Sequence, residues 1–248
     1  MALLWQKQTA ESCYEVRTHG ASVRLYSNGV FHSQWNPRDP LKGSLWELLL
    51  LPAFFVPAEQ IRRVLVLGVG GGAVIRLIQQ FLAPEEIVGV DIDRNHLHVA
   101  RRFFGVKGAR LECADARVFV DDQLALAESA RFDLVIDDLF GHVDGIAARA
   151  IDADITWCGK LLGLLNTTGL LVSNFASRKE LLQSGWRTGA IRQQLKGCWT
   201  AEHPGYNNCI GIFSRQGLSR RALTSRAPAP LNPENPQRRL ESRLRPLR

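Results

Sequence analysis

A glycine-rich turn between a short apolar segment and an amphipathic one most constrains the fold of this chain. Residues 68–72 are Gly-Val-Gly-Gly-Gly. They follow residues 64–67, which have the composition of a buried strand, and precede residues 73–82, which have helical spacing. Glycines at a strand-to-helix junction let backbone N–H groups approach a bound nucleotide closely. We therefore expect a nucleotide-binding βαβ unit that starts at residue 64.

The alternation of β-rich and helical segments continues to residue 213. Helices are predicted at 73–82, 95–104, 117–127, 151–165 and 179–195, and strands at 64–67, 87–90, 110–113, 132–136, 170–174, 198–202 and 209–213. Strict alternation predicts a parallel sheet with helices on both faces, and two closing strands without a helix between them add an antiparallel end. The expected fold class is α/β: the Rossmann-like fold of class I methyltransferases, with a mostly parallel seven-stranded sheet.

A short β-hairpin element is predicted before this domain. Asn28-Gly29 joins two segments of alternating polarity, 22–26 and 30–33, and Asn-Gly is a strong hairpin signal. The chain thus divides into three parts. Residues 1–57 form a small N-terminal β element with a helix, residues 58–215 a cofactor-binding Rossmann-like domain, and residues 216–248 an Arg/Pro-rich tail.

The net charge of +7 is confined to the C-terminal end of the chain. Residues 215–248 contain nine arginines and two acids, whereas residues 1–214 contain 22 basic and 22 acidic residues. The same end has five prolines and no aromatic residue, a composition that is typical of disorder. We expect a disordered, solvated extension rather than an RNA-binding arm, so nucleic acid is not an expected partner.

The cysteines and the apolar segments indicate in which cellular compartment the protein is expected. The five cysteines are spread singly, without the spacing of metal ligands, which is typical of a reducing cytoplasm and predicts no metal site. The longest apolar run, residues 48–56, contains Pro52 and is much shorter than the roughly 20 residues of a membrane helix. We therefore expect a soluble, cytoplasmic protein without a membrane partner.

Two carboxylates follow predicted strands of the nucleotide-binding unit. Asp91 ends the second strand, 19 residues after Gly72, where a carboxylate accepts hydrogen bonds from ribose hydroxyls. Asp115 ends the third strand, where it either accepts a hydrogen bond from an adenine amine or caps the helix that starts at residue 117. Together with Gly68 and Gly70, these residues predict an S-adenosylmethionine-type cofactor.

A third group of polar residues is predicted at the same edge of the sheet. Asp137 and Asp138 end the fourth strand, and Asn174 ends the fifth. Ligands of open α/β sheets bind at this edge, so we expect Asn174 to contact an acceptor substrate. Asp138 is the candidate for orienting or deprotonating an acceptor nitrogen, with Asp137 and His142 as further catalytic candidates. The alternative is that these side chains only solvate a loop and cap the next helix.

Between residues 24 and 214 the sequence resembles the spermidine synthase group of class I S-adenosylmethionine-dependent transferases. The resemblance is carried by the glycine loop and by Leu25-Tyr26-Ser27-Asn28-Gly29-Val30, Leu45-Trp46-Glu47, Val90-Asp91-Ile92-Asp93, Ala114-Asp115-Ala116, residues 132–138 and Gly211-Ile212-Phe213-Ser214. It implies that Asp91 binds the ribose and Asp115 the adenine amine, and that the cofactor is also bordered by Gly71, Gly72, Ile92, Ala116 and Asp138. It further implies a homodimer, and a pocket closed from the N-terminal side by Trp46 and Glu47.

The sequence departs from that family at two catalytic positions. The family's glycine loop has an aspartate where this chain has Gly71, and its D-x-x-D motif has a second aspartate where this chain has Gly141. An aspartate at position 71 would repel the carboxylate of S-adenosylmethionine, so Gly71 favours that cofactor. The loss of the acid at 141 removes the family's general base.

We therefore expect an S-adenosylmethionine-dependent methyltransferase that acts on a small amine or similar nucleophile. One alternative is a polyamine aminopropyltransferase (a spermidine synthase) that uses decarboxylated S-adenosylmethionine and a displaced acid such as Asp137 or Asp144. Another is a homologue that binds a nucleoside without catalysis.

Overall fold

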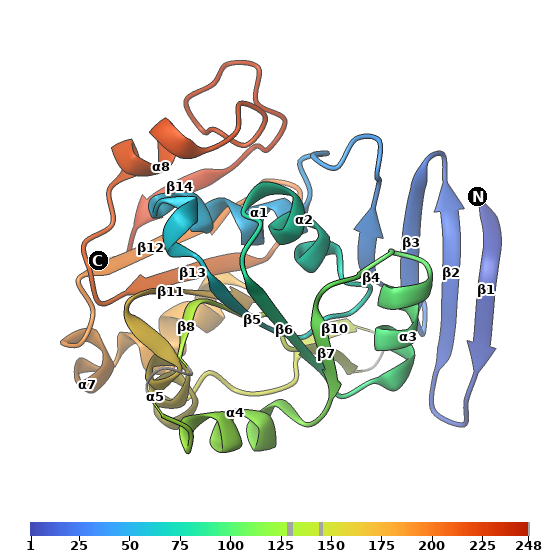
Figure 1. Ribbon diagram of the computed structural model, residues 1–248, viewed down its shortest axis with the longest axis horizontal. Helices are drawn as coiled ribbons and strands as arrows, with labels where there is room; N and C mark the ends of the chain where they lie inside the picture. Colours follow the sequence, from blue (N-terminus) through green and yellow to red (C-terminus); the bar gives the residue numbers. More distant parts are fainter. Residues whose placement is uncertain (128–130, 144–145, 248) are drawn as a thin grey trace.

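The computed structural model describes residues 1–127, 131–143 and 146–247, and its centre is an eight-stranded sheet (Figure 1). The strands lie in the order β14 (Arg243–Pro246), β12 (Gly197–Glu202), β13 (Cys209–Ser214), β11 (Leu165–Phe175), β8 (Phe132–Asp137), β5 (Arg63–Leu67), β6 (Glu86–Asp91) and β7 (Arg110–Cys113). Neighbours from β11 to β7 are parallel, and the other pairs are antiparallel. The predicted α/β class and the seven predicted strands are confirmed, and β14 is an addition to them.

Helices cover both faces of this sheet. In β5, Val64 and Val66 point to one face and Leu65 and Leu67 to the other, and all four are buried because the strand is covered on both sides. The first face packs against α1 (Leu45–Leu50), η1 (Leu51–Phe55), α2 (Ala73–Phe81), α3 (Arg94–Arg102) and α8 (Arg220–Arg226). The second packs against α4 (Ala116–Leu124), α5 (Ile155–Gly163), α6 (Arg178–Gln183) and α7 (Gly189–Arg192).

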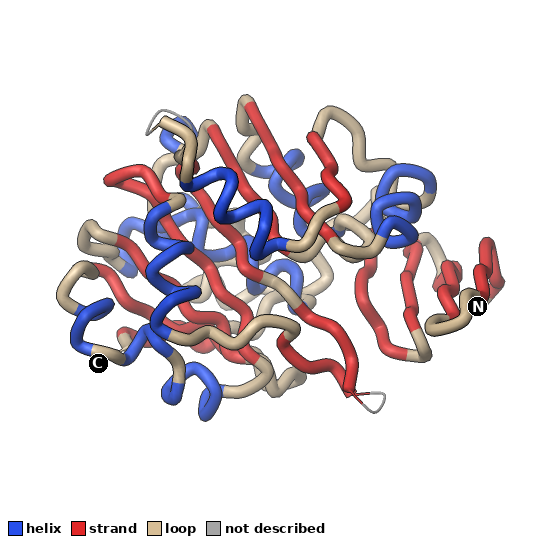
Figure 2. The backbone as a smooth tube through the Cα atoms, turned by 90° about the horizontal axis from the view of Figure 1, so that it is seen from below, coloured by secondary structure: helices blue, strands red, loops and turns tan. Residues whose placement is uncertain are grey.

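A four-stranded antiparallel sheet lies at one end of the molecule (Figure 2), beside α3 (Figure 1). It consists of β1 (Ala2–Gln8), β2 (Cys13–His19), β3 (Ser22–Ser27) and β4 (Val30–Trp35). The predicted Asn28-Gly29 hairpin joins β3 to β4, whereas β1 was not predicted. Tyr14 donates a hydrogen bond from its hydroxyl to Asp93 Oδ2 at 2.6 Å, so polar contacts as well as packing fix this sheet against the main domain.

The tail is ordered, so the prediction of a disordered extension is wrong. It forms α8 and β14, and β14 pairs with the otherwise free edge of β12. Five of its six leucines are buried in the cores of the domain: Leu223, Leu231, Leu240, Leu244 and Leu247. Figure 1 shows the tail in orange and red over the α1 side of the sheet, where Arg226 Nη1 donates to the backbone oxygen of Phe55 at 2.8 Å. A composition rule tests whether a segment can build its own core, and this one packs onto a core that already exists.

A second hairpin was also not predicted. It consists of β9 (Phe140–Val143) and β10 (Ile146–Arg149), which follow β8 where a loop was expected. Within the described ranges, no helix has the length and apolar character needed to span a membrane.

Candidate functional site

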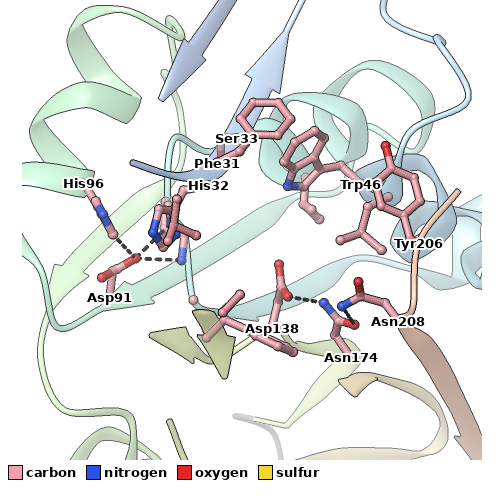
Figure 3. A pocket seen from close by; sticks show the side chains of 18 residues that line it. Phe31, His32, Ser33, Trp46, Asp91, His96, Asp138, Asn174, Tyr206 and Asn208 are labelled. Atoms are coloured by element: carbon pink, nitrogen blue, oxygen red, sulfur yellow. Dashed lines mark hydrogen bonds and ion pairs between the residues drawn. The ribbon is translucent and has the colours of Figure 1, made fainter. Parts of the chain in front are cut away.

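Several strands of the large sheet end at one edge, around a cavity of about 260 Å³ (Figure 3). Its wall includes Gly68 after β5, Asp91 at the end of β6, Asp138 after β8 and Asn174 near the end of β11. A second cavity of about 100 Å³ shares Gly68 and Asp91 with it and extends toward β7. This edge is where open α/β sheets bind ligands, so the two cavities, which share wall residues, are the candidate active site.

The glycine loop is shaped by close backbone packing. Gly68 and Gly70 have φ angles of +88° and +52°, a region that side chains rarely allow. A Cβ on Gly68 would lie 2.1 Å from the backbone oxygen of Asp138, so the exit of β8 requires glycine there. The backbone N–H groups of Val69 and Gly70 donate to Asp91 Oδ2 at 3.0 and 2.9 Å. The acid predicted to bind the ribose therefore also holds the loop.

Asp91 is paired with His96, which belongs to none of the motifs found in the sequence. His96 Nδ1 lies 3.5 Å from Asp91 Oδ2, and His96 Nε2 lies 2.9 Å from Ser27 Oγ. Burial acts to raise the pKa of Asp91, but the hydrogen bond and charge of His96 lower it below its usual value. Burial acts to lower the pKa of His96, and the pairing with Asp91 raises it overall. Asp91 is thus ionised at neutral pH and can accept hydrogen bonds from hydroxyl groups.

The second cavity has the features of a site for a planar base. Ile92 is 73% exposed and lies in its wall with Leu139, Asp115 and Ala116. Asp115 Oδ1 accepts a hydrogen bond from the backbone N–H of Arg117 at 2.7 Å and so caps α4. The second oxygen, Oδ2, accepts a hydrogen bond from Arg117 Nη1 at 3.3 Å, and both residues lie in the wall of this cavity. The predicted residues Ile92, Asp115 and Ala116 are brought together here.

Asp138 belongs to a chain of side-chain hydrogen bonds at the wall of the first cavity. Asn208 Nδ2 donates to Asn174 Oδ1 at 3.0 Å, and Asn174 Nδ2 donates to Asp138 Oδ1 at 2.7 Å. Burial raises the pKa of Asp138 to about 7; the hydrogen bond from Asn174 acts to lower it and the charge of Asp137 acts to raise it. A carboxyl group with this pKa exchanges protons near neutral pH, as a general acid or base must.

Asp137, although adjacent, lies outside the cavity. Its Oδ2 accepts hydrogen bonds from Arg149 Nη2 at 2.9 Å and from Ser173 Oγ at 2.6 Å, and both members of the Asp137–Arg149 pair are almost completely buried. Arg149 also donates to the backbone oxygen of Asn174. Because successive residues of a strand point to opposite faces, only Asp138 faces the ligand side. The position of Asp137 thus gives it a structural role, which differs from the predicted catalytic one.

The two N-terminal candidates are placed differently. Trp46 lines the first cavity, with its ring edge-on to Phe31 at a centroid distance of 5.2 Å. Glu47 points away and is 1% exposed. Its carboxylate accepts hydrogen bonds from the backbone N–H groups of Lys42, Gly43 and Ser44, at 2.6 to 3.2 Å, and so caps the start of α1. Glu47 therefore does not contact the cavity, contrary to expectation.

Gly71 and Gly72 line neither cavity. A Cβ on Gly71 would lie 2.6 Å from Phe104 Cζ and 2.7 Å from Ser33 Cβ, and its N–H donates to Ser33 Oγ at 2.8 Å. A Cβ on Gly72 would lie 2.6 Å from Val106 Cγ2. Close packing is the reason for both glycines, so the absence of an acid at position 71 carries no information about the charge of the cofactor.

Two candidates lie outside the described side chains, and several residues that line the first cavity were missed by sequence reasoning. The backbone of His142 lies in β9, and its side chain falls outside the described part of the chain, as does Asp144. His32, Tyr206 and Asn208 line the cavity without having been predicted. His32 lies in β4, and Tyr206 and Asn208 lie in the loop between β12 and β13. These segments are far from the glycine loop in sequence, and no sequence motif indicated that they reach the site.

Comparisons with known proteins show to which families and structures this chain is similar. Residues 48–156 match the spermine/spermidine synthase domain. The polyamine aminopropyltransferase of Pyrococcus abyssi is 37% identical over 84 residues, covering 31% of this chain and 30% of that protein. The Mycobacterium tuberculosis enzyme of the same name is 28% identical over 224 residues, covering 88% of this chain and 40% of that protein. The chain therefore spans well under half the length of these relatives.

A solved structure extends the likeness to almost the whole chain. A probable spermidine synthase from Corynebacterium glutamicum superposes with a TM-score of 0.76 at 14% identity, covering 99% of this chain and 91% of that one. The resemblance to spermidine synthases is confirmed. The methyltransferase prediction is wrong: the curated relatives are polyamine aminopropyltransferases, and the argument from Gly71 fails because that residue faces Phe104 and Ser33 rather than the cavity.

Proposed function

We propose that this chain, which resembles spermidine synthases, transfers an aminopropyl group from decarboxylated S-adenosylmethionine to an amine. One observation carries this proposal. The described residues that line the first cavity include two carboxylates and neither lysine nor arginine. Asp91 is paired with His96, which lines the same cavity, whereas Asp138 has no cationic partner in this lining. The cavity wall therefore favours a ligand that carries positive charge and has no carboxylate.

The electrostatic difference between the two cofactors is large in such a cavity. S-adenosylmethionine has a carboxylate that needs a cationic partner, whereas its decarboxylated form has only a sulfonium and an ammonium. A carboxylate held roughly 4 Å from the ionised form of Asp138 would be repelled by about 4 kcal/mol at the effective dielectric constant near a protein surface. An ammonium at the same place would be attracted by a similar amount. His96 offers no compensating charge because it is paired with Asp91.

The residues of this chain have distinct roles in the proposed reaction. Asp91 accepts hydrogen bonds from the ribose and Asp115 from the adenine amine, while Ile92 packs against the base. When bound, decarboxylated S-adenosylmethionine supplies a carbon next to a sulfonium, which leaves as methylthioadenosine. Asp138 accepts the proton that the acceptor nitrogen loses, and Asn174 holds Asp138 in place. Because the displacement is in line, the walls of the cavity mainly orient the two reactants and exclude water.

Binding and turnover together test this proposal. We expect calorimetry to give at least tenfold tighter binding of decarboxylated S-adenosylmethionine than of S-adenosylmethionine, and methylthioadenosine to be released when an amine is added. Asp138→Asn removes the base and is expected to lower kcat by roughly 10²-fold or more, with little change in cofactor affinity. Tighter binding of S-adenosylmethionine would refute the proposal. Binding without methylthioadenosine release from any amine would instead indicate a non-catalytic nucleoside-binding protein.

A further inference from the structure

One end of the first cavity is built by two segments outside the parallel part of the sheet, the start of α1 and the loop between β12 and β13. Their lining residues are Leu45, Trp46, Tyr206 and Asn208. Figure 3 shows Trp46 and Tyr206 on the opposite side of Asp138 from Asp91. We call this part of the cavity the acceptor end, because the proposed reaction assigns the adenosyl group to Asp91 and the proton of the amine to Asp138.

The C-terminal tail contacts the segment that leads into α1, residues 39–44. Arg239 Nη1 donates hydrogen bonds to Asp39 Oδ1 at 2.6 Å and to the backbone oxygen of Leu41 at 3.1 Å. A Cβ on Gly43 would lie 2.3 Å from the backbone oxygen of Arg239, so the two segments are in direct backbone contact. The tail therefore holds residues 39–44 just before the chain enters the cavity wall.

The same segment is also held by Glu47. The carboxylate of Glu47 accepts hydrogen bonds from the backbone N–H groups of Lys42 and Gly43 at 2.8 and 2.6 Å. The chain continues from this segment directly into Leu45 and Trp46. A shift of the segment relative to the tail would therefore move both cavity residues.

A few residues further on, the tail contacts the second segment of the acceptor end. β14 pairs with β12, and Arg243 lies opposite Glu202, the last residue before the loop that carries Tyr206. Pro204 in this loop and Glu241 in the tail line the same surface pocket. The tail thus contacts both segments that build the acceptor end.

The cofactor end of the site depends on other contacts. None of the described tail residues, 216–247, lines either cavity. The N–H groups of the glycine loop donate to Asp91 and Ser33, which belong to β6 and β4. A change in the tail can therefore alter the acceptor end and leave the glycine loop in place.

We propose that Arg239 is a positioning residue through which the tail sets the geometry of the acceptor end and so determines the affinity for the amine. The proposal rests on the aminopropyl transfer proposed above, which assigns the amine to this end. Contacts that the amine makes equally in the ground state and the transition state affect KM and leave kcat unaltered. A wall that is about 1 Å out of place loses much of such contact.

Steady-state kinetics of Arg239→Ala test this role with 1,4-diaminobutane as the amine. We expect KM for the amine to rise about fivefold or more, with kcat and KM for decarboxylated S-adenosylmethionine unchanged within about twofold. The control is Arg220→Ala, which removes an ion pair of the same tail with Glu234 and should leave all three constants unchanged. Both ion pairs are exposed, so neither variant should lower the unfolding free energy appreciably.

Three kinetic results would overturn the proposal. The first is an unaltered KM for the amine in Arg239→Ala. The second is an equal rise in the KM values of both substrates, and the third is a fall in kcat alone. Each of the last two would indicate a general structural effect rather than positioning of the acceptor end.

Hydrogen exchange tests the proposal without turnover. The N–H groups of Lys42 and Gly43 should exchange about fivefold or more faster in Arg239→Ala than in Arg220→Ala, because the segment loses one of its two supports. Those of Val69 and Gly70 should exchange equally in both variants. If the unchanged protein releases no methylthioadenosine with 1,4-diaminobutane, the proposed function fails, and exchange alone decides whether the tail holds the segment. Equal exchange at Lys42 and Gly43 in the two variants would show that it does not.

A second pair of variants disturbs the same contact from the other segment. Gly43→Ala presses a Cβ against the backbone oxygen of Arg239, whereas a Cβ on Gly20 meets no atom within 4 Å. Both glycines have positive φ angles, +78° and +58°, so both variants strain the backbone and only one disturbs the tail. We expect KM for the amine to rise in Gly43→Ala and to stay unchanged in Gly20→Ala. The same KM in both variants would contradict the proposal.

Discussion

The side-chain amide of Asn174 donates a hydrogen bond to Asp138 Oδ1 at 2.7 Å and so connects the end of β11 to the end of β8. The two residues are 36 positions apart in sequence, and the parallel pairing of their strands brings them together. Because this hydrogen bond stabilises the ionised form of Asp138, it opposes the effect of burial on the pKa of the carboxyl group. Asn174 is therefore a positioning residue that also adjusts the proton affinity of its neighbour.

Removing this hydrogen bond is expected to change the pH profile of the reaction. In the unchanged protein, kcat/KM for methylthioadenosine release should rise with pH through about 7, as Asp138 ionises. In Asn174→Ala the midpoint should move to higher pH. Asn207→Ala, on an exposed neighbouring loop, should leave the midpoint where it is. A purely structural role for Asn174 would lower the rate at every pH without moving the midpoint.

The raised pKa of Asp138 also predicts how stability depends on pH. The folded state retains a proton up to about pH 7, whereas the unfolded state loses it near the usual value of 3.8. This contribution to stability is fully present below the unfolded pKa and is lost as pH rises through the folded one. The melting temperature of Asp138→Asn relative to the unchanged protein should therefore increase from about pH 4 to about pH 7 and then level off. A constant difference over that range, measured by scanning calorimetry, would argue against a raised pKa.

Adding a side chain at Gly71 is expected to destabilise the fold. Gly71→Ala places a methyl group within 2.7 Å of both Phe104 Cζ and Ser33 Cβ, and such overpacking typically costs about 1–3 kcal/mol of unfolding free energy. Gly159→Ala in α5 is the control, because its added Cβ would meet no atom within 4 Å. Urea unfolding of the two variants compares them directly. Equal stability would mean that the space beside Gly71 is not filled as described.

The buried ion pair behind the site is expected to be essential for folding. Arg149→Ala leaves the completely buried Asp137 without its cation, and removing one partner of such a pair costs about 3–5 kcal/mol. Arg62→Ala removes one partner of an exposed pair with Glu85 and should leave the unfolding free energy unchanged within experimental error. Chemical denaturation that gives the same midpoint for both variants would contradict the assigned difference in burial.

The tail is expected to contribute to stability although its composition suggests disorder. Leu231 is completely buried, and Leu231→Ala should lower the unfolding free energy by about 2–5 kcal/mol. Gln237→Ala, on an exposed part of the same tail, should have no measurable effect. If Leu231→Ala unfolded at the same denaturant concentration as the unchanged protein, the tail would not be docked in solution.

The sequence by itself determined the central sheet and the part of the candidate site around the glycine loop. These features depend on local patterns, namely apolar periodicity, glycines at a strand-to-helix turn, and the acids Asp91 and Asp115 at strand ends. The positions of Asp138 and Asn174 at the cavity follow from the topological rule for the edge of a parallel sheet, whereas Trp46 was expected there from the family resemblance.

Only the tertiary structure decided what these patterns leave open. In the structure, Asp137 pairs with Arg149 whereas Asp138 faces the cavity, and Glu47 caps α1. Gly71 is required by the packing of Phe104 and Ser33, and the tail pairs with β12. Each outcome depends on atoms that are distant in sequence. The charge balance of the cavity, on which the proposed aminopropyl transfer rests, likewise depends on side chains from different strands and loops that come together only in the folded protein. Local sequence patterns do not predict such long-range contacts, because burial and pairing are properties of the folded chain.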